Sequence, residues 1–260
     1  MSIEVTLITG ASSGIGEAFA RRLAAEGHNL LLVARSEHLL KSLSALLEEK
    51  FGISCFYLPI DLTKSDSIEK IRDFTSSKSL QITWLINNAG FGSLGYFHNL
   101  ELERELEMIK LNIEALLALT HLFLPSMLDN KKGVILNVSS AAGFQPVPFM
   151  ATYAATKTFV NSFTAAIAEE YRKSGVRIFA LCPGSTKTNF FSNSGINRPV
   201  TYKGQQTAEQ VVEFALKCIN KRQYLAVSGL SNRLVAFAVR FLPTRLVTKV
   251  VAKIYRKRLK

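Results

Sequence analysis

The sequence predicts an α/β fold, a doubly wound parallel sheet of about seven strands with helices on both faces. Short runs of apolar and β-branched residues recur along the 260 residues, and longer helical patterns separate them in strict alternation. A glycine-rich turn follows the first run. With 48% hydrophobic residues, a chain of this length can bury a large core. We predict one domain over residues 1–232 and a basic helical extension over 233–260.

The predicted strands are nearly continuous in apolar residues, as expected for parallel strands that helices cover on both faces. They are VTLITG from Val5, NLLLVA from Asn29, SCFYLPID from Ser54, ITWLINNAG from Ile82, GVILNVSS from Gly133, VRIFALCPG from Val176 and QYLAVSG from Gln223. Helical patterns lie between them, near 14–26, 36–50, 65–77, 101–129, 152–173 and 207–220. The alternation contains no sequence repeats and no linker that would divide the domain.

The first strand ends in TGASSGIG, which spans Thr9 to Gly16. Gly10 permits a tight turn, Gly14 lets the backbone approach a pyrophosphate, and Gly16 allows close helix packing. Ser12, Ser13 and Ile15 complete the loop, and the N-terminus of the next helix favours phosphate. Three glycines alone also suit a purely structural turn. Their place between the first strand and the first helix favours a Rossmann-type dinucleotide site.

The end of the second strand bears on which dinucleotide binds. An NAD site usually has an acidic residue about 20 residues after the glycine motif, where it accepts hydrogen bonds from the ribose. Arg35 occupies that place here. A guanidinium attracts a 2′-phosphate, so we expect NADP(H) to be preferred. NAD(H) stays open as the alternative, with Glu37 as its partner and Arg35 as a solvated surface residue.

Cysteine usage and the N-terminal residues bear on the compartment. Cys55, Cys182 and Cys218 are scattered without a CxxC pair, and MSIEVTLITGASSGIG lacks a basic region and a cleavage site. We therefore expect a reduced, cytoplasmic setting. No uncharged apolar run reaches the roughly 18 residues that a membrane span needs.

Three motifs in this order resemble the short-chain dehydrogenase/reductase family. They are TGASSGIG, NNAG at residues 87–90 and YAATK at residues 153–157. The resemblance covers about residues 3–230. It implies hydride transfer with a nicotinamide cofactor and a catalytic set of Asn112, Ser140, Tyr153 and Lys157. It also implies homodimers or homotetramers that pair through the segments 101–129 and 152–173.

The resemblance further implies which residues bind the cofactor. Asp61, with Leu62 beside it, resembles the residue that contacts adenine. The loop PGSTKT at 183–188 resembles the one that holds the carboxamide of the nicotinamide. The remaining implied cofactor residues are Asn88, Ala89, Gly90, Tyr153, Lys157, Pro183, Gly184, Thr186 and Thr188.

The spacing of Tyr153 and Lys157 has a physical meaning of its own. A phenol with a pKa of about 10 is a poor proton shuttle near neutrality unless its anion is stabilised. Lys157 lies one helical turn further on the same face and can place an ammonium near that anion. Taken singly, Tyr153 would be a packed aromatic, Ser140 a capping residue and Asn112 an exposed helix residue. Ser139 competes with Ser140, and the 13-residue spacing to Tyr153 favours Ser140.

The loops at the carboxyl ends of the predicted strands are aromatic and carry no cluster of charges. The candidate substrate residues are Phe91, Phe144, Phe149, Met150, Phe190 and Phe191. We expect a lipophilic ketone, aldehyde or secondary alcohol, either steroid-like or 3-ketoacyl-like, that exchanges hydride with NADP(H), and no metal. Two alternatives remain open: an NADPH-binding sensor or scaffold, and an NAD-linked alcohol dehydrogenase.

The net charge of +12 lies in the last part of the chain. After Glu213 there are twelve basic residues and no acidic residue, whereas residues 1–213 are neutral overall. In TRLVTKVVAKIYRKRLK, from Thr244 to Lys260, a helical period separates an apolar face from a basic face. This segment predicts either peripheral contact with an anionic membrane or a helix packed on its own domain or on a second copy. We expect no nucleic acid, because no binding module accompanies the charge.

Overall fold

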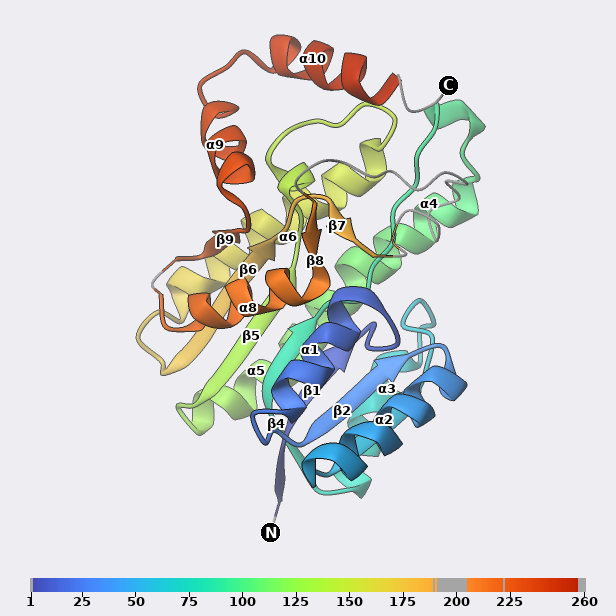
Figure 1. Cartoon of the computed structure of the whole chain (residues 1–260), viewed down its shortest axis with the longest axis vertical. Helices are drawn as coiled ribbons and strands as arrows, with labels where there is room; N and C mark the ends of the chain where they lie inside the picture. The colour runs from blue at the N-terminus through green and yellow to red at the C-terminus, as the bar shows by residue number, and fades with distance from the viewer. Residues whose placement is uncertain (1, 189, 191–204, 222, 257–260) are drawn as a thin grey trace.

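The computed structural model describes residues 2–188, 190, 205–221 and 223–256. Its main sheet has seven parallel strands in the order β3-β2-β1-β4-β5-β6-β9, which confirms the predicted fold class (Figure 1). The strands are β1 (Ile3–Thr9), β2 (Leu30–Ala34), β3 (Cys55–Pro59), β4 (Leu80–Asn87), β5 (Gly133–Val138), β6 (Val176–Cys182) and β9 (Leu225–Val227). The strand order reverses between β1 and β4, and a doubly wound sheet binds its ligand at such a point.

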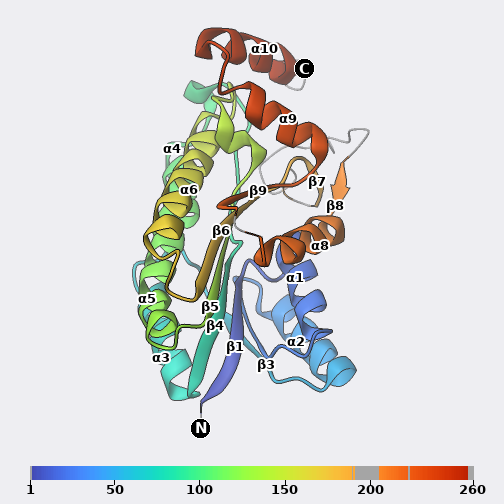
Figure 2. The same ribbon diagram turned by 90° about the vertical axis from the view of Figure 1, so that its left-hand side faces the viewer.

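Helices cover both faces of the sheet (Figure 2). One face carries α1 (Gly14–Ala24), α2 (Glu37–Phe51) and α8 (Ala208–Ile219), and the other carries α3 (Ser67–Ser77), α4 (Leu102–Ile109), α5 (Leu116–Asp129) and α6 (Ala151–Glu170). Successive residues of each central strand point to opposite faces, so Ile8 joins the core on the first side and Leu7 the core on the second. Both side chains are fully buried.

The helix that runs from α4 to α5 contains a π-helical turn, Lys110–Ala115. The whole stretch Leu102–Asp129 is long and apolar enough to cross a membrane, although Glu114 interrupts its apolar run. In this fold α5 packs against β4 and β5 and buries Leu119, Phe123 and Met127 in the core. The hydropathy of the stretch is therefore accounted for by its place as a core helix.

Two features go beyond the predicted elements. A pair of two-residue strands, β7 (Thr186–Lys187) and β8 (Gln206–Thr207), forms a second sheet that is too short to leave a sequence pattern. Helices α9 (Leu230–Ala238) and α10 (Thr244–Arg256) lie at the end of the molecule opposite the N-terminus (Figures 1 and 2). Helix α9 crosses the boundary predicted at residue 232, because the chain leaves the sheet at Gly229, where φ is +87°.

One face of the last helix, α10, packs on the domain, and another face is exposed. Val251 and Tyr255 of α10 contact a small apolar cluster, which we call the satellite cluster. Its buried members are Met108, Val147, Met150, Tyr153 and Ala154. This cluster is separate from the two cores that flank the sheet. The extension therefore forms part of the wall above the carboxyl ends of the strands.

Candidate active site

The turn between β1 and α1 is held against the end of β4. Gly10 has a φ of +65°, which favours glycine, and a Cβ on Gly16 would lie 2.3 Å from the carbonyl oxygen of Gly10. Asn88 donates from Nδ2 to the carbonyl oxygen of Thr9 at 2.9 Å and to that of Gly10 at 3.3 Å. The backbone N–H groups of Asn88 and Ala89 both donate to the hydroxyl of Thr9 at 2.9 Å. These bonds fix the turn with the N-terminus of α1 facing the site.

A cavity of about 650 Å³ lies at the carboxyl ends of the strands. Most of the predicted cofactor residues line it: Gly10, Ser12, Ser13, Gly14, Ile15, Arg35, Asp61, Leu62, Asn88, Ala89, Gly90, Tyr153, Lys157, Pro183, Gly184, Thr186 and Thr188. Phe91, Met150 and Phe190 line it as well. Gly16 does not reach the lining and instead allows the close packing of α1 described above. Residues distant in sequence thus meet in one cavity, as the predicted topology requires.

At one end of the cavity lie two opposite charges, the guanidinium of Arg35 and the carboxylate of Asp61. Arg35 is exposed, and Asp61 accepts hydrogen bonds from the backbone N–H and hydroxyl of Thr63 at 3.0 and 2.8 Å. Burial acts to raise the pKa of Asp61, but the two bonds from Thr63 and the charge of Arg35 outweigh it and leave that pKa below its usual value. This end therefore carries an ionised carboxylate and a guanidinium.

At the middle of the cavity, Lys157 and Tyr153 are both buried in α6. The ammonium of Lys157 donates to the carbonyl oxygen of Val138 at 2.8 Å and lies 5.9 Å from the centroid of the Tyr153 ring. Burial raises the pKa of Tyr153 to about 12, while its hydrogen bond with Ser140 acts in the opposite direction. Burial lowers the pKa of Lys157 to about 8. At neutral pH the phenol is therefore protonated and able to donate, and Lys157 keeps its charge.

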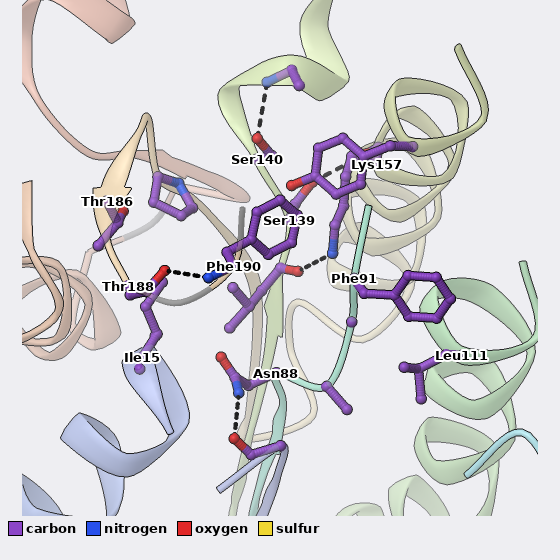
Figure 3. A pocket seen from close by; sticks show the side chains of 18 of the residues that line it. Ile15, Asn88, Phe91, Leu111, Ser139, Ser140, Lys157, Thr186, Thr188 and Phe190 are labelled. Carbon is purple, nitrogen blue, oxygen red and sulfur yellow. Dashed lines mark hydrogen bonds between the residues drawn. The ribbon is translucent and has the colours of Figure 1, made fainter. Parts of the chain in front are cut away.

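Ser139 and Ser140 have different partners. Ser139 is buried and donates from its hydroxyl to the backbone carbonyl of Lys157 at 3.1 Å. Ser140 accepts from the backbone N–H of Ala142 at 3.1 Å (Figure 3), and its hydroxyl acts to lower the pKa of Tyr153. Of the two serines, Ser140 is therefore the one that acts on the pKa of the tyrosine.

Asn112 lies in the π-helical turn and is almost fully buried. Its Nδ2 donates to the carbonyl oxygen of Phe91 and to the hydroxyl of Thr156, both at 3.0 Å, and its Oδ1 accepts from the backbone N–H of Phe91 at 3.2 Å. The side chain is absent from the cavity lining. Its hydrogen bonds hold the segment after β4 against α6, and π turns of this kind are frequent at functional sites.

The predicted substrate residues divide into two groups. Phe190 packs with its ring centroid 5.3 Å from that of Tyr153, and Phe91 and Met150 share the lining with it. Phe149 instead faces the ring of Tyr96, at 5.2 Å, and Phe144 faces the guanidinium of Arg240, at 6.0 Å. Neither belongs to the lining, and Phe149 has a φ of +71°. Phe191 lies outside the described residues.

Several lining residues had no signal in the sequence. Ser36 and Thr63 lie beside Arg35 and Asp61, and the lining also includes Glu107, Leu111, Gln145, Val147, Asn232, Val235, Ala236 and Tyr255. The last four come from α9 and α10, which no motif connects with the site. For these residues, the one signal in the sequence was the helical period of apolar residues in α10, which predicted that one face of the helix is buried.

Comparisons with known proteins agree with this geometry. Residues 4–198 match the family model for short chain dehydrogenases. A very-long-chain 3-oxoacyl-CoA reductase of Macaca fascicularis is 32% identical over 98% of this chain and 78% of its own length. A hydroxysteroid dehydrogenase-like protein 1 of Gallus gallus is 32% identical over 73% of this chain and 58% of its own length.

A solved short-chain dehydrogenase from Sphingobium yanoikuyae in complex with NADPH superposes with a TM-score of 0.82. It is 33% identical, and the match covers 91% of this chain and 92% of that structure. The family model covers well over half of the chain, and the motifs, the sheet order and the cavity agree with it. The chain therefore belongs to the short-chain dehydrogenase/reductase family and is an NAD(P)-dependent oxidoreductase.

Proposed function

We propose that the chain uses NADPH to reduce the keto group of a long lipophilic substrate, and that this substrate is a 3-oxoacyl thioester. The observation that carries the proposal is the cavity itself. It joins a charged end, with Arg35 and Asp61, to an apolar end, with Phe91, Met150 and Phe190. Ligand sites of this kind combine apolar walls with a few polar groups that fix orientation.

The lining fits a nicotinamide dinucleotide. The N-terminus of α1 and the turn after β1 offer backbone N–H groups to phosphates. A Cβ on Gly14 would lie 3.2 Å from the side chain of Thr188, so a glycine keeps the space between these two walls open. Arg35 would hold a 2′-phosphate, Asp61 the adenine side, and Lys157 with residues 183–188 the nicotinamide side. When bound, the cofactor supplies the hydride that reduces the carbonyl carbon.

Side chains of the protein donate the proton and stabilise the anion that donation leaves behind. Tyr153 donates its phenolic proton to the carbonyl oxygen as the carbon is reduced, so the ketone becomes an alcohol. Ser140, whose hydroxyl acts to lower the pKa of Tyr153, holds the same carbonyl oxygen. The ammonium of Lys157 stabilises the phenolate that remains, and Asn112 keeps the segment after β4 in place.

The choice of a 3-oxoacyl chain rests on two supports. A relative with 32% identity over nearly the whole chain is named a very-long-chain 3-oxoacyl-CoA reductase. The apolar end of the cavity is formed by Val147, Val235 and Tyr255 besides the aromatic residues, and this wall suits an alkyl chain. A steroid-like ketone is the competing substrate, and the experiments below separate the two.

The preference for NADPH is tested with Arg35→Ala. We expect the dissociation constant for NADPH to rise by about 10- to 100-fold, because a charge-assisted pair with the 2′-phosphate contributes about 1.5–3 kcal/mol. The affinity for NADH should stay near its wild-type value. The measurement is fluorescence titration with both cofactors, with the exposed Arg72→Ala on α3 as the matched control. Equal changes for NADPH and NADH would remove Arg35 from the cofactor assignment.

The substrate class is tested with 3-oxoacyl thioesters of increasing chain length. Each buried CH₂ contributes about 0.8 kcal/mol, so kcat/KM should rise about fourfold per carbon until the apolar end is filled. The measurement is NADPH oxidation, with a steroid ketone panel in parallel. A flat chain-length profile with rapid turnover of a steroid ketone would contradict the acyl substrate and leave the reductase. NADPH binding without turnover of any carbonyl would contradict the reductase and favour a sensor.

A further inference from the structure

Exposed apolar side chains are concentrated on α9, α10 and the turn between them. They are Leu230, Leu234, Val235, Phe237, Phe241, Leu242, Leu246, Val250 and Ile254. Phe237 and Phe241 are 64% and 73% exposed and contact each other with ring centroids 5.0 Å apart. A concentration of exposed apolar side chains of this kind marks a site of interaction with a protein or a membrane. We call this surface the α9–α10 face.

Helix α10 arranges its side chains in three stripes, each repeating every four residues. Val247, Val251 and Tyr255 point inward, where Val247 is buried and the other two pack on the satellite cluster. Leu246, Val250 and Ile254 form the next stripe and are each about half exposed. Arg245, Lys249 and Lys253 form the outermost stripe. An apolar stripe beside a basic stripe is the arrangement of a helix that lies in a membrane interface.

All the charged side chains on α9, α10 and the turn between them are basic. Six basic residues lie on the two helices or the turn between them: Arg233, Arg240, Arg245, Lys249, Lys253 and Arg256. None of them forms an ion pair in the described part of the chain. No acidic residue follows Glu213 in the sequence. Pairing two such faces in a symmetric dimer would bring like charges together, whereas anionic lipid headgroups complement them. The charge therefore favours a membrane over a second copy.

The same two helices line the apolar end of the cavity. Val235 and Ala236 of α9 and Tyr255 of α10 contribute to the lining, and the exposed apolar side chains of the α9–α10 face lie on the same two helices. We infer that the α9–α10 face docks on an anionic bilayer and brings the apolar end of the cavity to the lipid surface. This geometry suits a substrate that is dissolved in the bilayer, a consequence that rests on the proposed function.

Cosedimentation of the full chain with vesicles tests the docking. We expect binding to vesicles of phosphatidylcholine with phosphatidylglycerol, and little binding to phosphatidylcholine alone at the same salt concentration. Each cation near an anionic bilayer contributes about fivefold in partitioning, so the triple variant Arg245→Gln, Lys249→Gln, Lys253→Gln should bind about 100-fold more weakly. The triple variant Leu246→Gln, Val250→Gln, Ile254→Gln should also lose binding.

A matched control removes three exposed lysines at other places, Lys41→Gln, Lys50→Gln, Lys78→Gln, and should bind as the wild type does. NADPH affinity shows that each variant is folded, and binding to vesicles needs no turnover, so it is judged apart from the reductase. Equal loss in the control, or no binding of wild type to anionic vesicles, would overturn the inference. A change from dimer to monomer in the Leu246, Val250, Ile254 variant, without a change in vesicle binding, would assign the face to a second copy and overturn it as well.

Discussion

Tyr153→Phe is expected to lower kcat for ketone reduction by about 1,000-fold, within the range by which a positioned general acid accelerates a reaction. The substitution removes only the hydroxyl, so the ring keeps its packing against Phe190 and the satellite cluster. NADPH affinity should stay near the wild-type value. The measurements are single-turnover oxidation of NADPH and fluorescence titration of the cofactor.

Tyr171→Phe is the matched control, because Tyr171 lies at the C-terminal end of the same helix, outside the cavity lining, and loses the same hydroxyl. It should retain kcat, since it leaves the site unchanged. Burial raises the pKa of Tyr153 to about 12, so the donor stays protonated throughout the neutral range. Full activity of Tyr153→Phe would exclude it as the proton donor.

Lys157→Met is expected to stabilise the fold while it abolishes turnover. Burial lowers the pKa of Lys157 to about 8 from 10.5, and a depression of this size corresponds to about 3 kcal/mol of destabilisation below pH 8. The substitution also leaves the carbonyl of Val138 without its donor, which costs about 1–2 kcal/mol. The net expectation is a gain of about 1–2 kcal/mol in the free energy of unfolding at pH 7.

The pH dependence of the free energy of unfolding distinguishes the removal of a buried charge from improved packing as the cause of this gain. Between pH 8 and 10.5 the unfolded chain holds the proton of Lys157 and the folded chain does not, so this residue makes wild-type stability rise with pH there. The advantage of Lys157→Met should therefore be largest below pH 8 and shrink towards pH 10.5. Urea unfolding across this range measures it, with the exposed Lys173→Met as the control. A difference that does not change with pH would contradict the explanation by a buried charge.

The fold was predictable because its local patterns and its topology agree. Buried parallel strands leave continuous apolar runs, and all seven of those predicted form the main sheet. The helix starts at Gly14 and Ala208 fall within a residue of the expected positions. The motif residues of the cofactor end were likewise predictable, because a turn between a strand and a helix fixes where its backbone points.

The substrate end was harder to predict, since its walls come from elements whose relative positions no local pattern sets. Phe144 and Phe149 occur in the expected segment, yet Phe149 has a positive φ and its ring faces Tyr96. Tyr255 lies about 100 residues from Tyr153 in sequence, and only tertiary packing brings both to one cavity. Oligomeric state and cellular location stay predictions.

The satellite cluster has a consequence for how such a chain diversifies. Val147 and Met150 line the cavity, with Met108 buried in the same cluster, and none of the three belongs to either core beside the sheet. Substitutions at Val147 and Met150 alter the shape offered to a substrate while the strands and the glycine turn keep their support, and Tyr153 keeps its ring contact with Phe190. The strands and the glycine turn that support hydride transfer are thus largely separate from the residues that shape the substrate wall. A few substitutions in one small cluster can therefore change the range of substrates.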